Sequence, residues 1–249
     1  MSSVRDAYDR HAGVYDELLG PSEIRSDVWE IADRFFGEGM RLLDAGCGSG
    51  DDAIHFARRG VQVTAVDISP AMIARLKLKC GETVRCEVAA METYSPEGIC
   101  FDGVFSNFSS LNYVSDLRWL RRIPLTPGAY LVLTTLGRFY PLESAILVLK
   151  GHPWLALRRF RRSCEGEVAG IHFRVYYHSV RAIQNALGSR FELKLVAGLR
   201  ALMPIPDLDH LRRLKVCRLL RPIDRWWCTH LPTAVLSDQF ISVWRAAQS

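Results

Sequence analysis

Three glycines at alternate positions, preceded by an acidic residue, form the segment of the sequence best suited to hold a ligand. They lie in residues 42–50 (LLDAGCGSG), where an apolar strand is expected to turn into a helix. Glycine lets the backbone turn sharply and lets a ligand approach bare N–H groups. A second apolar stretch ends at Asp67, and an acid that closes the second strand of a β–α–β unit is placed to accept hydrogen bonds from ribose hydroxyls. The pattern predicts a nucleoside-binding site.

The spacing of the glycines separates two kinds of nucleoside ligand. Dinucleotide-binding turns have the spacing G-x-G-x-x-G, whereas this chain has G-x-G-x-G. Asp51 and Asp52 follow the last glycine, where a pyrophosphate would have to approach. Two carboxylates repel a diphosphate but are compatible with a ligand that carries an ammonium and a sulfonium. A nicotinamide-dependent oxidoreductase is therefore a distant alternative.

This pattern resembles motif I of the class I S-adenosylmethionine-dependent methyltransferases. Residues 101–108 (FDGVFSNF) look like the small-molecule branch of that family, because they lack the [DN]-P-P-[YF] motif of the branch that methylates amines of bases or glutamine. The resemblance implies S-adenosylmethionine as cofactor, with its methionine end on the glycine loop, its ribose on Asp67 and its adenine against Ile68. Asp44 would orient the loop, and Cys47 would be a small side chain that fills space.

The resemblance also implies a set of cofactor-binding residues, which follow the carboxyl ends of the first four strands and include one tyrosine near the N-terminus. They are Tyr15, Asp44, Gly46, Cys47, Gly48, Asp67, Ile68, Met91, Glu92, Ser106 and Asn107. The chain departs from the family at Ala90, where an acid usually bonds the adenine amino group, so backbone groups and the Met91 thioether are expected to hold adenine.

Tyr8 and Tyr15-Asp16 match an N-terminal helix that covers the cofactor in similar enzymes. An amphipathic surface helix with half-buried tyrosines explains them equally well.

Residues that bind the acceptor are harder to recognise in the sequence. Methyl transfer from a sulfonium is an in-line displacement that needs the nucleophile about 3–3.5 Å from the methyl carbon. A base is required only if the acceptor is protonated at neutral pH. Tyr176 and His178, on or beside a strand expected after the fifth, are the candidate catalytic residues, although aromatic residues in pockets more often supply shape. The other histidines make no ligand-spaced set, so no metal site is expected.

Apolar stretches alternate with helical ones as far as residue 135, which indicates an α/β fold with a doubly wound, mostly parallel sheet. We expect strands at 41–45, 61–67, 84–89, 101–106, 129–135, 191–198 and 238–245, and an isolated strand at 171–177. Helices are expected at 3–19, 22–36, 52–59, 69–79, 116–123, 141–150 and 179–187. The resemblance implies a seven-stranded sheet in which the antiparallel C-terminal strand inserts between its two predecessors.

The sequence predicts three parts. Residues 1–136 are expected to form the cofactor-binding core with N-terminal lid helices, 137–177 an inserted substrate lid after strand five, and 178–249 the completion of the core sheet. An irregular basic excursion is expected at 199–234. Within the lid, we expect Arg159 and Arg174 to face an acidic acceptor.

Charge is distributed unevenly between these parts. Residues 1–136 carry 14 lysines and arginines against 19 acidic residues, and residues 137–249 carry 18 against 8. An acidic first half suits a cationic cofactor, and a basic second half suits an acidic substrate, a phospholipid surface or nucleic acid. The basic runs at 158–162 and 212–227 could be solvated helix faces, an interfacial patch or an RNA site. Since no recognised RNA-binding module is present, no nucleic-acid partner is expected.

The seven cysteines include no C-x-x-C pair, which argues for a reducing compartment and against a disulfide framework. The N-terminus has no apolar signal core, and no apolar run approaches the roughly 20 residues of a membrane span. A cytoplasmic location is therefore expected.

The resemblance implies methyl transfer to O or N of a small-molecule acceptor, and the basic cap favours one that is acidic or lipid-like. One alternative is methylation of a quinone or another membrane-dissolved acceptor, with peripheral membrane contact through the basic cap. Another is a non-catalytic S-adenosylmethionine-binding module. The acceptor and the oligomeric state are left open.

Overall fold

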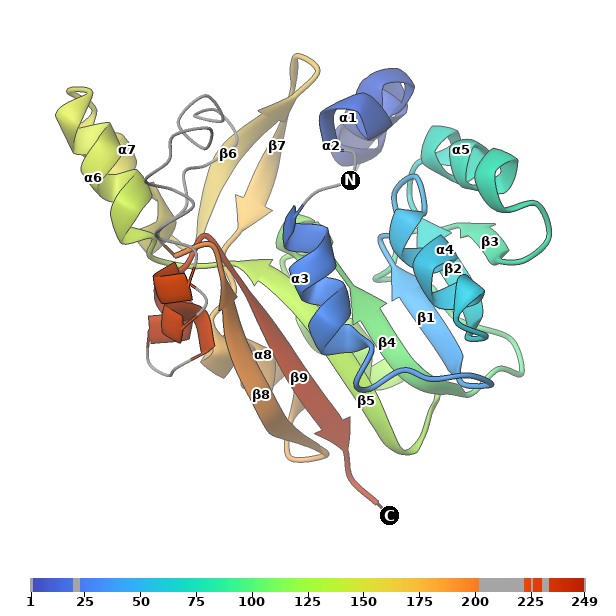
Figure 1. Ribbon diagram of the computed structural model, residues 1–249. Coiled ribbons are helices and arrows are strands. Elements are labelled where there is room, and N and C mark those ends of the chain that lie inside the picture. Colours follow the sequence, from blue (N-terminus) through green and yellow to red (C-terminus); the bar gives the residue numbers. More distant parts are fainter. Residues whose placement is uncertain (1, 20–22, 202–221, 225, 230–232, 249) are drawn as a thin grey trace.

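The computed structural model describes residues 2–19, 23–201, 222–224, 226–229 and 233–248. Its centre is a seven-stranded sheet in the order β3-β2-β1-β4-β5-β9-β8 (Figure 1). The strands are β1 (Arg41–Ala45), β2 (Gln62–Asp67), β3 (Arg85–Val88), β4 (Phe101–Ser106), β5 (Leu125–Leu136), β8 (Phe191–Leu199) and β9 (Gln239–Ala246).

The last strand lies between its two predecessors. β9 pairs antiparallel with β5, where Trp244 faces Leu131, and antiparallel with β8, where Trp244 faces Leu193. The pairs among β1, β2, β3, β4 and β5 are parallel. The predicted fold class, including the antiparallel C-terminal strand, is confirmed.

Helices cover both faces of the sheet. On one face lie α3 (Glu23–Ala32), α4 (Asp51–Arg58) and α5 (Pro70–Cys80); on the other lie α8 (Val180–Leu187) and the 3₁₀ turn Leu117–Arg122. Neighbouring residues of a strand point to opposite faces, so Leu42 packs in the first layer and Leu43 in the second. The edge-to-face ring pairs Phe36–Phe56 and Phe56–Phe105, with centroids 5.6 and 4.9 Å apart, fill the first layer.

Serine caps begin two of the helices where the sequence predicts them. The Ser69 hydroxyl accepts the Met72 N–H at 3.1 Å, and Pro70 occupies the first turn of α5. The Ser179 hydroxyl accepts the Ala182 N–H at 3.1 Å at the start of α8. The predicted helix at 116–123 is instead a 3₁₀ turn, capped by the Asp116 side chain.

Two strand predictions need correction. The strand predicted as isolated is β7 (Ile171–Tyr176), which pairs antiparallel with β6 (Ser163–Val168) to form a hairpin. β5 begins at Leu125, before the predicted start at residue 129, and so contains Pro127-Gly128. The register with β4 shifts there, so these two residues lie in an irregularity inside the strand.

The N-terminal segment lies over the carboxyl ends of the parallel strands. It consists of α1 (Ser2–His11), a 3₁₀ turn (Ala12–Val14) that contains Gly13, and α2 (Tyr15–Leu19) (Figure 1). Ala7 of α1 packs against Phe173 and Val175 of β7. The N-terminal helix is therefore held between the hairpin and the core.

The insertion after β5 contains α6 (Pro141–Leu149), α7 (Pro153–Ala156) and the β6–β7 hairpin. Arg159 anchors it to the sheet, because its buried guanidinium donates to the carboxylates of Glu143 at 2.6 Å and Asp238 at 2.7 Å. It also donates to the carbonyl oxygens of Gly137 and Asp238, at 3.3 and 2.9 Å. The expectation that Arg159 faces an acceptor is wrong, because its guanidinium is buried and paired with carboxylates inside the protein. Arg174, the other arginine expected to face an acceptor, is exposed.

Much of the predicted basic excursion lies outside the described residues, including Arg212, Arg213, Lys215, Arg218, Arg221 and Arg225. In the described part, residues 222–224 and 226–229 are helical and Thr233–Leu236 forms a 3₁₀ turn that leads into β9. Across the same described residues, none of the helices has both the length and the apolar character that a membrane crossing requires.

Candidate functional site

The glycine loop connects β1 to α4 in a left-handed backbone conformation. Gly46, Gly48 and Gly50 have φ values of 77°, 54° and 88°. A Cβ added to Gly46 would lie 2.6 Å from the Cβ of Ser110 and 2.9 Å from the Cε of Met91. The loop therefore needs glycine for its backbone angles and, at Gly46, also for close packing.

Asp67 ties the loop to the start of the next helix. Its Oδ2 accepts the Gly48 N–H and its Oδ1 accepts the Ser69 N–H, both at 2.9 Å. Burial raises the pKa of Asp67, and the two backbone donors oppose that rise. Each oxygen keeps a second lone pair, so the carboxylate is able to accept bonds from a ligand as well.

Asp44 is a second carboxylate beneath the loop and is almost fully buried. Its Oδ2 has no hydrogen-bond partner. Burial and the nearby negative charges of Asp52 and Asp67 raise its pKa, while Arg25 opposes the rise. An unpartnered buried carboxylate oxygen, beside two more acids, favours a ligand that brings a positive charge.

Asp9 and Asp16 fasten the N-terminal helices over the loop. Asp9 Oδ1 accepts from the Ser69 hydroxyl at 2.5 Å and from the Ala71 N–H at 3.1 Å. Asp16 accepts from the Ser49 hydroxyl at 2.5 Å and pairs with Arg75 at 2.7 Å and Lys79 at 2.9 Å. Although burial opposes ionisation, these donors hold the pKa of Asp16 well below its usual value. Both contacts reach α5 and the loop, so they hold α1 and α2 over the loop, and we call these two helices the lid.

Three tyrosines from the lid and the opposite wall meet inside the site. The hydroxyls of Tyr8 and Tyr113 are 2.6 Å apart, and the Tyr15 ring meets the Tyr8 ring at a centroid distance of 6.2 Å. A Cβ at Gly48 would lie 3.3 Å from the Tyr15 hydroxyl. Burial raises the pKa of all three phenols, so they are neutral at physiological pH.

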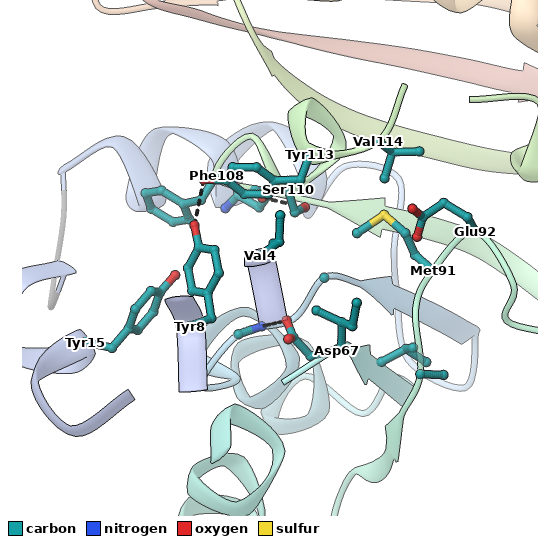
Figure 2. A pocket seen from close by; sticks show the side chains of 16 residues that line it. Val4, Tyr8, Tyr15, Asp67, Met91, Glu92, Phe108, Ser110, Tyr113 and Val114 are labelled. Atoms are coloured by element: carbon teal, nitrogen blue, oxygen red, sulfur yellow. Dashed lines mark hydrogen bonds between the residues drawn. The ribbon is translucent and has the colours of Figure 1, made fainter. Parts of the chain in front are cut away.

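These elements enclose a cavity of about 680 Å³, counting its open mouth. Figure 2 shows Tyr8 and Tyr15 at the left of the cavity, Ser110 and Tyr113 above it, Met91 at its right and Asp67 below it. The lining consists of Val4, Tyr8, Tyr15, Gly46, Gly48, Val66, Asp67, Ile68, Ala89, Met91, Glu92, Asn107, Phe108, Ser110, Tyr113 and Val114.

The wall that follows β4 has a strained backbone. Phe108 and Ser109 have φ values of 47° and 61°, which are uncommon outside glycine. Asn107 holds this turn, since its Oδ1 accepts the Phe108 N–H at 2.7 Å and its Nδ2 donates to Asp52 at 3.1 Å. The Arg25 guanidinium lies 4.4 Å from the Phe108 ring centroid and 3.0 Å from Asp52. The contacts of Asn107 and Arg25 thus hold Phe108 in one position.

Eight of the eleven predicted cofactor residues line the cavity. Of the others, Asp44 lies beneath the loop as described, and Ser106 donates its hydroxyl to the Ala45 carbonyl at 2.8 Å. Cys47 is buried, and burial raises the pKa of its thiol, which fits the expected space-filling role. These three residues support the loop from behind the described lining.

The two candidate catalytic residues support the cavity wall from outside its described lining. His178 is buried and its Nε2 lies 2.8 Å from the Val114 carbonyl oxygen; burial lowers its pKa. The backbone carbonyl of Tyr176 accepts from the Asn112 side chain, whose Oδ1 in turn accepts the Leu136 N–H at 3.0 Å. Both residues therefore hold the 110–114 segment that carries Ser110 and Tyr113.

Some lining residues were absent from the predicted set. Two of them could have been predicted from the sequence: Phe108 follows a predicted strand, and Tyr8 is part of the N-terminal tyrosine pattern. Val4, Ser110 and Tyr113 could not, because only the packing of α1 on the segment after β4 brings them to the cavity.

Comparisons with known proteins agree with this geometry. The methyltransferase domain family matches residues 42–123. A ubiquinone biosynthesis O-methyltransferase of Methylocella silvestris is 36% identical over 107 residues, which are 41% of this chain and 41% of that protein. The match thus spans less than half the length of that relative.

Two solved structures share the fold over most of the chain. A putative S-adenosylmethionine-dependent methyltransferase from Listeria monocytogenes has a TM-score of 0.64 and 16% identity, covering 90% of this chain and 99% of that one. The 1,6-didemethyltoxoflavin-N1-methyltransferase of Burkholderia thailandensis, solved with bound 1,6-didemethyltoxoflavin and S-adenosylhomocysteine, has a TM-score of 0.60 and 16% identity. It covers 99% of this chain and 88% of that one. Residues 42–123 therefore match the methyltransferase domain family, and the chain around them shares its fold with S-adenosylmethionine-dependent methyltransferases of known structure.

Proposed function

We propose that this protein transfers a methyl group from S-adenosylmethionine to an oxygen or nitrogen of a small-molecule acceptor. The observation that carries the proposal is the cavity in which the glycine loop and Asp67 meet, above the buried carboxylate of Asp44. Such a site suits a nucleoside with a positive charge. S-adenosylmethionine is one, and when bound it supplies an electrophilic methyl group.

The lining residues divide into those that would hold the cofactor and those left for the acceptor. Asp67 would bind the ribose hydroxyls, and Gly46 and Gly48 would lie against the methionine end, where Asp44 offers negative charge. Ile68 and Met91, with Ala89 and Glu92, would surround the adenine. The two protein structures of this fold described above are named as S-adenosylmethionine-dependent or solved with S-adenosylhomocysteine, which supports the choice of cofactor.

The acceptor would meet residues from the lid and from the wall after β4. Asn107 and Arg25 fix Phe108, and Tyr8 and Tyr113 close the space between the lid and that wall. A closed lid excludes water from the reacting centre and holds the acceptor in line with the methyl group. Because the phenols are neutral, we propose that the tyrosines orient the acceptor and do not remove its proton.

Tyr176 and His178 were the candidate bases. Their bonds to the 110–114 segment support a role in positioning Tyr113, and we propose that role for them. A base is needed only for an acceptor that is protonated at neutral pH, so an acceptor already ionised would fit this site without one.

The acceptor class is proposed from charge and from relatives. The basic second half favours an acidic or lipid-like acceptor. The relative named for ubiquinone biosynthesis supports the alternative of a quinone-like acceptor dissolved in membrane, and the didemethyltoxoflavin enzyme shows that the fold also serves N-methylation.

We also propose a cytoplasmic location and no nucleic-acid partner. A non-catalytic binding module is less favoured, because lining residues such as Tyr113 and Val114 extend the cavity beyond the predicted cofactor contacts.

Two measurements on the purified protein test the proposal. S-adenosylhomocysteine at about 100 times its dissociation constant should stabilise the fold by about 2.7 kcal/mol, visible as a rise in melting temperature, whereas NADH should not. Isotopically labelled S-adenosylmethionine should then label phenolic, carboxylic or amine acceptors from a panel. A thermal shift with NADH alone would refute the cofactor assignment. Binding of S-adenosylhomocysteine with no labelling of any acceptor would favour the binding module.

A further inference from the structure

Helix α6 has its burial pattern reversed. A surface helix usually buries its apolar residues and exposes its charged ones. In α6 the buried residue is Glu143, at 4% exposure, while Val148 and Leu149 are 53% and 87% exposed. The helix sequence, PLESAILVL, is otherwise almost wholly apolar.

Ion pairs explain why the charged residue points inward. The Glu143 carboxylate accepts from Arg158 at 2.5 Å and from Arg159 at 2.6 Å, and Arg159 also binds Asp238 at the start of the last strand. The helix is attached through its acid, and Val148 and Leu149 at its C-terminal end are left exposed.

The exposed apolar surface continues beyond α6. Trp154 is 82% exposed, and about half of each of Leu155, Leu157 and Phe160 is exposed. We call residues 141–162 the arm. Its exposed apolar side chains are those of Val148, Leu149, Trp154, Leu155, Leu157 and Phe160.

The exposed charges of the arm have one sign. Between Glu143 and Glu165 the sequence has no acidic residue, and Lys150, Arg161 and Arg162 of this stretch are exposed. Cations beside exposed tryptophan and aliphatic side chains match the boundary between anionic headgroups and acyl chains. A second copy of the chain fits less well, because a two-fold contact through the arm would place these cations against each other.

From this combination we infer that the arm docks the protein on the surface of an anionic lipid bilayer. The arm follows the carboxyl end of β5, at the end of the sheet where the lid also lies (Figure 1). Docking would therefore bring the cavity end of the molecule to the lipid. The inference rests on the arm alone and does not depend on the proposed methyl transfer.

Vesicle sedimentation of the full chain tests the inference. The wild type should sediment with phosphatidylcholine vesicles that contain roughly one-third phosphatidylglycerol, less with phosphatidylcholine alone, and less again as salt is raised. Leu149→Ser with Trp154→Ser should lower the bound fraction at least about tenfold. Arg161→Ser with Arg162→Ser should lower it by a similar factor on anionic vesicles only.

Matched controls lie on α5 and α4. Leu78 is 88% exposed, so Leu78→Ser removes an equally exposed leucine from another surface. Arg58→Ser with Lys77→Ser removes two exposed cations there. All of these variants should keep the wild-type melting temperature and affinity for S-adenosylhomocysteine, because the side chains are exposed and outside the described cavity lining.

Three outcomes would overturn the inference. The first is no sedimentation of the wild type with either vesicle. The second is equal losses in the arm variants and in the α5 and α4 controls. The third is a concentration-dependent dimer, in light scattering, that the arm variants abolish without any vesicle binding, since the arm would then bind a second copy. A failure of S-adenosylhomocysteine binding in every protein would bear on the proposed function and not on the arm.

Discussion

Asp67 and Asp51 are both acids near the glycine loop, but their surroundings differ. Asp67 accepts two backbone N–H groups and lines the cavity. Asp51 is partly exposed and pairs with Lys79 at 3.0 Å and Arg25 at 3.5 Å. The first is therefore suited to bind a ligand, and the second to balance charge on the surface.

We predict that Asp67→Ala weakens binding of S-adenosylhomocysteine by roughly 10- to 100-fold, because charge-assisted hydrogen bonds to the ribose are lost. Asp51→Ala should weaken it by less than about threefold, since exposed charge pairs contribute little. Titration calorimetry measures both, with melting of the unliganded variants as the folding control. Equal losses, or a larger loss for Asp51→Ala, would show that the ribose lies elsewhere.

Replacing Asp44 by asparagine should raise the stability of the unliganded protein but lower its affinity for the ligand. Its pKa is raised by burial, so the folded protein holds a proton more tightly than the unfolded chain does. The stability of the unliganded protein should therefore fall as pH rises from about 4 through the raised pKa. Asp44→Asn carries no charge to bury, so it should have the higher free energy of unfolding at pH 8, with the gap closing towards pH 4.

The same substitution should lower affinity for S-adenosylhomocysteine, because it removes the negative charge beneath the loop that we propose attracts the ligand's ammonium. Urea unfolding across the pH range, with calorimetry at neutral pH, measures the two effects. If Asp44→Asn were less stable than the wild type at pH 8 and bound the ligand normally, Asp44 would be a structural residue of the loop.

At the scale of elements, one buried side chain ties helix α6 of the insertion to the end of the core sheet. Arg159 bridges Glu143 of α6 and Asp238 beside β9, two residues far apart in the sequence. Arg174, on the exposed face of β7, makes no such bridge between carboxylates in the described structure. The two arginines look alike in the sequence, and only burial separates them.

We predict that Arg159→Ala lowers the free energy of unfolding by about 3–5 kcal/mol, because two carboxylates lose their buried partner. Arg174→Glu should change it by less than about 0.5 kcal/mol, as is usual for exposed positions. Urea unfolding with a common slope for all variants measures this difference. A loss of under about 1 kcal/mol for Arg159→Ala would mean that the insertion is not held to the sheet through this residue.

The hairpin shows why some elements could not be predicted. β6 and β7 are joined by Ala169-Gly170, with φ values of 52° and 75°. A tight hairpin turn of this kind needs positive φ at both positions, and Asn-Gly is its usual sign in a sequence. Alanine gives no such sign, and β6 (SCEGEV) has little apolar alternation, so only β7 could be recognised.

At the scale of the whole molecule, the two halves differ in charge and in their proposed ligands. Residues 1–136 are net acidic and supply the described cavity lining, whereas residues 137–249 are net basic and contain the arm and hairpin. Long-range attraction of an acidic acceptor should depend on salt, since the Debye length falls from about 30 Å at 0.01 M to about 10 Å at 0.1 M.

We predict that raising the ionic strength from about 0.01 to about 0.1 M increases the KM of an acidic acceptor severalfold. The KM of the corresponding neutral methyl ester, and the affinity for S-adenosylhomocysteine, should change by less than roughly twofold. Steady-state kinetics on an acid–ester pair found in the acceptor screen makes the comparison. Equal salt dependence of acid and ester would mean that the basic half does not attract the acceptor.

The sequence by itself determined what depends on short stretches of chain. Within residues 41–80 the strand ends, the positive φ of the glycines, the Ser69 cap and the position of Asp67 all follow from residue type and spacing. The reason is that a strand–loop–helix–strand unit forms most of its contacts within a few tens of residues, where periodicity and turn chemistry are legible.

Only the tertiary structure decided the closure of the site and the roles of the arginines. The Tyr8–Tyr113 contact joins residues 105 positions apart, and the Arg159–Asp238 contact joins residues 79 apart. Such pairs depend on how the lid and the insertion pack on the sheet, and nothing in the local sequence distinguishes a buried arginine from an exposed one. The same holds for α6, whose single acid is buried in ion pairs while Val148 and Leu149 at its end are exposed.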